Sequence, residues 1–85
     1  MSELVEEFES RLTRRYGEFV PPQALWKELG FATAASFRKA LSQDRVDVEV
    51  FDIPGRRGSF ARALDVARWQ ANVYATRRRS GKDSH

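Results

Sequence analysis

The spacing of apolar residues changes along this chain, and each change predicts a new element. In the first segment, apolar side chains recur at every fourth position from Leu4 to Tyr16, which places them on one face of a helix. Ser2 can cap the start of this helix and Gly17 can end it. The pattern therefore predicts an N-terminal helix within residues 1–17.

Two short helices are expected next, over residues 19–43. Proline fits the first turn of a helix, so one helix can begin at Pro22, and Gly30 stops it. The other helix begins after Thr33, which is a good N-cap residue. The inward-facing apolar residues of the two helices are Leu25, Trp26, Leu29, Phe37, Ala40 and Leu41. Two short helices joined by a tight turn that contains glycine form the helix-turn-helix pattern.

An alternating pattern then replaces the helical one. Valine at every second position of residues 46–50 is strand spacing. Pro54 ends the strand, and Gly55 and Gly58 permit the chain to reverse its direction. This segment predicts a two-stranded hairpin over residues 46–61, with a short return strand.

Helical spacing returns over residues 63–76, which predicts a C-terminal helix. Residues 77–85 are polar and basic, and we expect them to form a flexible tail. The chain is therefore expected to be one α+β domain over residues 1–76. The expected fold is a winged helix-turn-helix with an extra N-terminal helix, a two-stranded wing hairpin and a C-terminal helix.

Length and composition limit what this domain can be. With 85 residues the chain has room for one domain, and 41% hydrophobic residues favour folding over disorder. The absence of cysteine excludes disulfides and thiolate zinc sites. No apolar run approaches the roughly 18 residues of a membrane span, and the acidic N-terminal segment lacks the features of a signal peptide. We therefore expect a cytoplasmic protein.

Positive charge is concentrated in a few segments of the chain. The net charge is +3 and the isoelectric point is about 9.8, which suits a nucleic-acid binder. Arg56 and Arg57 lie between Gly55 and Gly58 at the tip of the predicted hairpin. They could serve only to keep a turn soluble, but after a helix-turn-helix pattern they favour contact with DNA phosphates.

Further candidate DNA contacts lie on the second helix of the helix-turn-helix. Arg38 and Lys39 are adjacent, so they cannot both face the core, and their position favours contact in the major groove over an ordinary exposed face. Thr33 can cap the helix while the first turn contacts a phosphate. Arg77 and Arg78 belong either to a solvated tail or to a contact with DNA or a partner. The full set of candidate DNA-binding residues is Thr33, Ser36, Arg38, Lys39, Gln43, Arg56, Arg57, Arg77 and Arg78.

Four stretches, VPPQALWKELGF, FRKAL, GRRGSFA and DVARW, resemble the small winged-helix excisionases. These proteins are the recombination directionality factors of phages and integrative elements, and they are close in fold to AlpA-type regulators and to the DNA-binding domain of MerR-type regulators. The resemblance covers about Phe19 to Gln70. It implies a protein that binds double-stranded DNA beside an attachment site, bends it, and directs a tyrosine integrase toward excision. The N-terminal helix is long for this family, and the final helix lacks a capping Ser or Thr.

Other functions are open on the same fold. A transcriptional regulator of a mobile element would use the same DNA-binding surface, and a protein–protein adaptor would retain the fold without binding DNA. The acidic residues of the N-terminal helix suit a favourable helix start, or a face that docks on a neighbouring copy along DNA. These residues are Glu3, Glu6, Glu7 and Glu9.

The sequence gives little support for catalysis. The single histidine, His85, is terminal, and we find no nucleophile–base arrangement and no glycine-rich phosphate loop before a helix. Acidic residues between positions 44 and 52 alternate along a predicted strand, which is poor geometry for one cation. We therefore expect no enzyme activity, metal, cofactor, small-molecule substrate or membrane partner.

Aromatic residues interleaved with basic ones can also indicate stacking on single-stranded nucleic acid. Here the aromatic residues fall at helical and strand spacing, which favours a role in the core. The residues expected in the core are Trp26, Phe31, Phe37, Phe60 and Trp69.

Overall fold

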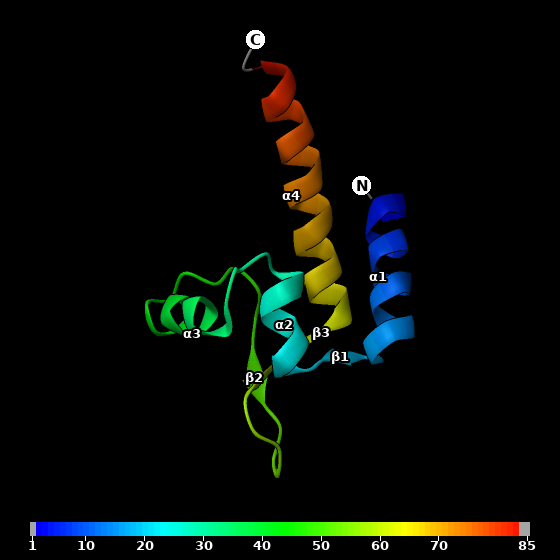
Figure 1. The fold of residues 1–85 in the computed structure, drawn as a ribbon. Coiled ribbons are helices and arrows are strands. Elements are labelled where there is room, and N and C mark those ends of the chain that lie inside the picture. The colour runs from blue at the N-terminus through cyan, green and yellow to red at the C-terminus, as the bar shows by residue number, and fades with distance from the viewer. Residues whose placement is uncertain (1, 84–85) are drawn as a thin grey trace.

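Within residues 2–83 the chain folds into four helices and a three-stranded antiparallel sheet (Figure 1). The computed structural model describes the backbone of these residues and the side chains of residues 3–76. In chain order the elements are α1 (Ser2–Tyr16), β1 (Phe19–Val20), α2 (Pro22–Glu28), α3 (Ala34–Ser42), β2 (Phe51–Asp52), β3 (Ser59–Arg62) and α4 (Ala63–Asp83). This α+β arrangement is compatible with a winged-helix-like fold.

Helices α1 and α4 pack against each other and run in opposite directions (Figure 1). Their contact includes Phe8 and Tyr74, whose ring centroids are 6.4 Å apart in an edge-to-face arrangement. Gly17 ends α1, because its N–H donates to the Thr13 carbonyl and its φ of 88° lies in the region that favours glycine. The predicted N-terminal helix is therefore confirmed, and it packs on its own domain.

Helices α2 and α3 confirm the predicted pair of short helices. Pro22 occupies the first turn of α2, where the missing N–H of proline has no intrahelical partner to lose. Thr33 is the N-cap of α3, and its hydroxyl accepts a hydrogen bond from the Ser36 N–H at 3.0 Å. Gly30, in the connection, has a φ of 84°, so glycine there permits the tight turn.

The sheet has the strand order β1-β3-β2, and β3 pairs antiparallel with both neighbours. Phe19 of β1 pairs with Arg62, and Phe51 of β2 pairs with Phe60. The β2–β3 pairing is antiparallel, as expected, but these strands belong to a three-stranded sheet where a two-stranded hairpin was expected. Strand β1 is an addition that the pattern does not predict, because its 2 residues are too short a run to show alternation.

The predicted strand from Val46 onward is wrong in its extent, because β2 contains only 2 residues. Strand β3 becomes α4 at Ala63, so in the register that pairs Phe51 with Phe60 residues 46–48 would fall opposite α4 and have no strand to pair with. The alternation of burial nevertheless holds, since Val48 is buried while its polar neighbours are exposed. This segment therefore packs on the core as irregular chain.

Helix α4 starts at Ala63, as predicted, but ends later than expected. The Ala63 N–H donates to the Glu18 carbonyl at 2.8 Å, so a backbone carbonyl outside the helix satisfies one of the first N–H groups of α4, which have no partner within the helix. At its other end α4 continues to Asp83, past Thr76, where the apolar pattern ends. The expected tail of residues 77–85 thus begins within α4, and its side chains lie outside the described residues.

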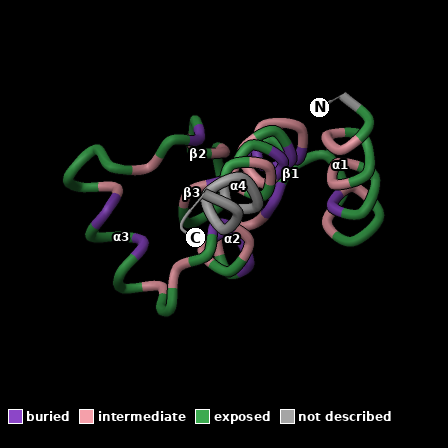
Figure 2. The backbone as a smooth tube through the Cα atoms, turned by 90° about the horizontal axis from the view of Figure 1, so that it is seen from above, coloured by how far each residue is buried: buried purple, intermediate pink, exposed green. Residues whose placement is uncertain are grey.

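The hydrophobic core takes buried residues from all four helices and from β1 and β3, and Figure 2 shows them in purple. Its largest fully buried side chains are Leu12, Val20, Leu25 and Val66. The expected core aromatics differ in burial: Phe37 is 4% exposed, whereas Trp26, Phe31 and Trp69 are partly buried against the core. Phe60 is also buried, at 5% exposed, but it lies outside this cluster.

A polar cluster joins α1, α2 and α4. The Glu28 carboxylate accepts hydrogen bonds from Tyr16 Oη at 2.7 Å and from Gln70 Nε2 at 3.0 Å, and Gln70 also donates to the Glu28 carbonyl at 2.9 Å. Burial raises the pKa of Tyr16, and the hydrogen bond and negative charge of Glu28 raise it further, against the opposing charge of Arg15. The cluster fixes α2 against the α1–α4 pair.

We expect Gly58→Ala to destabilise the fold more than Gly55→Ala. Both glycines have positive φ, 89° and 83°, so each alanine carries a backbone strain of about 1–2 kcal/mol. A Cβ at Gly58 would also lie 2.6 Å from Pro22 Cγ, whereas a Cβ at Gly55 meets nothing within 4 Å. Urea denaturation should therefore show an additional loss of about 1–3 kcal/mol for Gly58→Ala. Equal losses would contradict this role for the contact between Gly58 and Pro22.

Replacing Tyr16 with Phe should lower the free energy of unfolding by about 1 kcal/mol near neutral pH, because the hydrogen bond to Glu28 is lost while the ring remains. The pKa of Tyr16 is raised in the folded state. The hydrogen bond therefore stabilises the fold fully below about pH 10, the pKa of tyrosine in the unfolded chain. This stabilisation is lost as the pH rises through the pKa of Tyr16 in the folded state. Urea denaturation of both proteins across this range should show their stabilities converging. A constant difference would contradict the prediction.

Candidate nucleic-acid interface

The candidate residues on α3 are exposed, while the opposite face of the helix is buried. Phe37 and Ala40 face the core, at 4% and 1% exposed. Ser36, Arg38 and Lys39 are all exposed. The helical period therefore separates an apolar face that anchors α3 from a polar face that is available to a ligand.

The start of α3 is held by the side chain of Thr33, and its end by the backbone N–H of Gln43. At the start, the Thr33 hydroxyl caps the helix and also lies 2.9 Å from the Ser36 hydroxyl. At the end, the Gln43 N–H bonds to the Lys39 carbonyl at 3.1 Å. The Gln43 side-chain oxygen accepts a hydrogen bond from Arg45 Nε at 2.8 Å. Thr33, Ser36 and Gln43 thus have structural partners as well as exposed positions.

Arg56 and Arg57 lie in the loop between β2 and β3, which we call the hairpin loop (residues 53–58). The Arg56 N–H bonds to the Ile53 carbonyl at 2.9 Å and so closes the turn. Both arginine side chains are exposed. These two residues therefore lie in the loop that joins two antiparallel strands of the three-stranded sheet.

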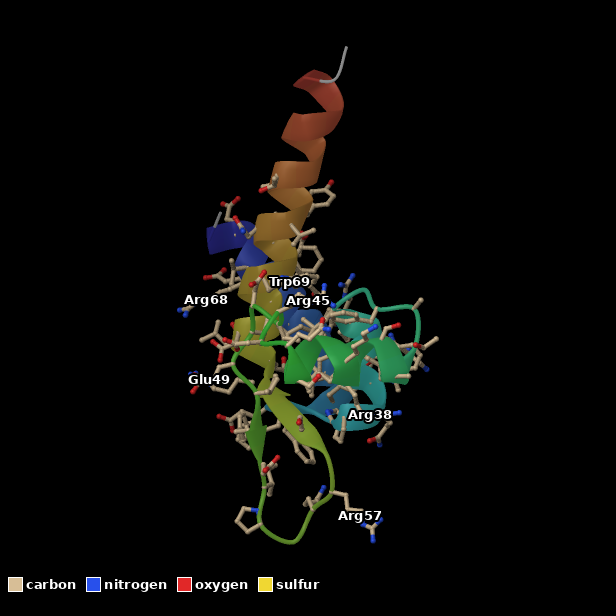
Figure 3. The ribbon with its side chains drawn as sticks, turned by 90° about the vertical axis from the view of Figure 1, so that its left-hand side faces the viewer. Arg38, Arg45, Glu49, Arg57, Arg68 and Trp69 are labelled. Atoms are coloured by element: carbon tan, nitrogen blue, oxygen red, sulfur yellow. The ribbon has the colours of Figure 1, made fainter. Side chains whose placement is uncertain are left out.

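The hairpin loop and α3 present arginines on the same side of the molecule. Figure 3 shows Arg38 and Arg57 on that side, whereas Glu49 and Arg68 lie on the opposite side. Arg45, which the sequence does not single out as a candidate, lies along the other edge of α3 from Arg38 (Figure 3). The sequence shows only a basic residue shortly after the end of α3. This pattern is too common to identify Arg45 as a DNA-binding residue.

A small cavity joins α3 to the hairpin. It has a volume of about 160 Å³ and is lined from α2 by Trp26, from α3 by Phe37 and Arg38, and from the hairpin by Gly58 and Ser59. The spacing between Arg38 and the hairpin loop is therefore set by packing around this cavity and by the approach of Gly58 to Pro22.

Arg77 and Arg78 are in a different position. Their backbone belongs to α4, whose C-terminal end is at the opposite end of the molecule from the hairpin loop (Figure 1). Their side chains lie outside the described residues. The backbone therefore does not bring these two residues next to the candidates on α3 and the hairpin loop.

The described residues contain neither a metal cluster nor a membrane span. No three His, Cys, Asp or Glu side chains among them lie close enough together to hold a metal ion. None of the helices in this part of the chain is long and apolar enough to cross a bilayer.

Replacing Thr33 with Ala should cost about 1 kcal/mol of stability, because the Ser36 N–H at the start of α3 loses its partner. Thr33→Ser keeps the hydroxyl and should retain most of that stability. Urea denaturation of both variants separates loss of the capping hydroxyl from other consequences of changing residue 33. A serine variant as unstable as the alanine variant would contradict the role of the hydroxyl.

Comparisons with known proteins do not assign a family or a function to this chain. No family model, no curated protein and no solved structure matches the chain. A functional assignment therefore depends on the residues and on their arrangement in the fold.

Proposed function

We propose that this chain is a winged-helix domain that binds double-stranded DNA in a sequence-specific manner. In this proposal α3 enters the major groove and the β2–β3 hairpin is the wing, which contacts the neighbouring backbone. The observation that carries the proposal is the position of Arg38 on α3 and Arg57 in the hairpin loop, on the same side of the molecule (Figure 3).

The exposed face of α3 supports this assignment. An α-helix fits the major groove of B-DNA, and arginine there can bond to guanine through two hydrogen bonds. Arg38 and Lys39 are exposed. The neighbouring Phe37 is buried in the core and holds the helix in place. Arginines in the hairpin loop add phosphate contacts, which fix orientation and supply salt-dependent affinity.

The resemblance in sequence supplies the finer assignment. It favours a cytoplasmic, excisionase-like recombination directionality factor that bends DNA, acts with a tyrosine integrase, self-associates on DNA and has no catalytic activity. A transcriptional regulator would use the same surface.

Three single substitutions test duplex binding. Arg38→Ala should lower affinity for the preferred duplex by about 1–3 kcal/mol and relax specificity at one position. Arg57→Ala should weaken binding to all duplexes and reduce the salt slope by about 1. Arg68→Ala is the matched control, because Arg68 is exposed on the opposite side of the molecule.

Fluorescence anisotropy with labelled duplexes at several salt concentrations measures these effects. The control should bind as the wild-type protein does. If Arg38→Ala and Arg57→Ala also bind as the wild type does, the proposed surface is wrong. A protein–protein adaptor is then the better assignment.

A further inference from the structure

The two faces of the sheet carry different side chains. Residues paired directly across antiparallel strands share a face, and neighbouring residues along a strand alternate between faces. Val20 pairs with Ala61, and both are 0% exposed in the core. The opposite face, which we call the outer face, therefore carries Phe19, Phe51, Phe60 and Arg62.

The outer face carries three phenylalanines, of which Phe60 is buried and Phe19 is exposed. Phe19 and Phe51 contact each other edge to face across β3, with ring centroids 5.3 Å apart. Neither ring, nor that of Phe60, belongs to the core cluster. Phe19 is 40% exposed. It is thus a large apolar side chain left open to solvent on a rigid strand.

A groove of about 570 Å³ runs beside these rings. It is lined by the rings of Tyr16, Phe19 and Phe60, together with Ile53 and Arg56 from the hairpin loop. Gln23 and one carboxylate, Glu18, also line it. Arg62 is exposed and is paired with Phe19. Aromatic rings and two arginines therefore occupy one continuous surface of the sheet.

We propose that the outer face binds single-stranded nucleic acid. Exposed bases stack on Phe19, which is 40% exposed, and the phosphates pair with Arg56 and Arg62. Single strands combine flat apolar bases with regularly spaced negative charges, which matches the rings and guanidinium groups of this surface.

The same surface does not suit a duplex. Bases in a duplex are stacked on one another, whereas unpaired bases can be splayed out onto aromatic side chains. The outer face also lies on the side of the sheet opposite the buried Val20 and Ala61. The two proposed sites are therefore separate surfaces, apart from Arg56 in the hairpin loop, and can be tested independently.

Phe19→Leu and Arg62→Gln test the proposal directly. Phe19→Leu keeps an apolar side chain and removes the ring. Loss of one stacked base should weaken binding of a labelled oligothymidine by at least about 5-fold in fluorescence anisotropy. Arg62→Gln should also weaken binding and should reduce its salt dependence. Both positions are exposed, and circular dichroism checks that each variant is folded.

Matched controls come from α4. Tyr74→Leu removes the other large exposed aromatic ring, which is 46% exposed, and Arg68→Gln removes an exposed arginine. Both should bind the oligothymidine as the wild type does. Arg38→Ala should leave single-strand binding unchanged even where it abolishes duplex binding, so the two proposals fail separately.

Four results would overturn the proposal. The first is absence of oligothymidine binding by the wild-type protein at low salt. The second is equal binding by Phe19→Leu, Arg62→Gln and the wild type. The third is loss of single-strand binding in Arg38→Ala, which would place single strands on the duplex surface. Binding of an acidic, leucine-rich peptide in place of the oligothymidine would assign the face to a protein partner instead.

Discussion

The fold depends on one short strand, β3, that pairs on both of its edges and then continues directly into α4. Its pairing with β1 fixes the chain between α1 and α2, and its pairing with β2 fixes the hairpin. Ala61 at its centre is 0% exposed. The hydrogen bond from Ala63 to the Glu18 carbonyl then ties the first turn of α4 to the segment before β1. Four residues, Ser59–Arg62, thus set the positions of five other elements.

The position of the candidate DNA surface depends on this strand. The hairpin loop joins β3 at Gly58, where the close approach of Pro22 leaves no room for a side chain. Because Pro22 begins α2 and α2 packs on α3, the loop is held at a set distance from the polar face of α3. Arg38 and Arg57 are exposed, but the elements that carry them are anchored by buried residues.

Much of this arrangement could be predicted from local signals. The helices, the Thr33 cap and the hairpin with Arg56 at its end follow from apolar spacing and from glycine and proline positions. Strand β1 and the short extent of β2 could not be predicted, because both depend on where β3 lies in the fold and on where it passes into α4. For the same reason the alternation at residues 46–50 suggests a strand that does not form. The sequence also cannot show that Phe19 and Phe51 lie together outside the core, because they come from opposite edges of the sheet.

In our proposal α3 and the hairpin loop recognise duplex DNA. In vitro selection from a random duplex library, with the purified protein at near-physiological salt, tests this recognition first. We expect enrichment of a defined motif. Tandem direct repeats would agree with an excisionase whose copies bind head to tail along DNA. An inverted repeat would agree with a regulator that binds as a dimer with two-fold symmetry. If the protein retains DNA only through salt-sensitive binding, and no motif is enriched, this surface does not recognise a specific sequence.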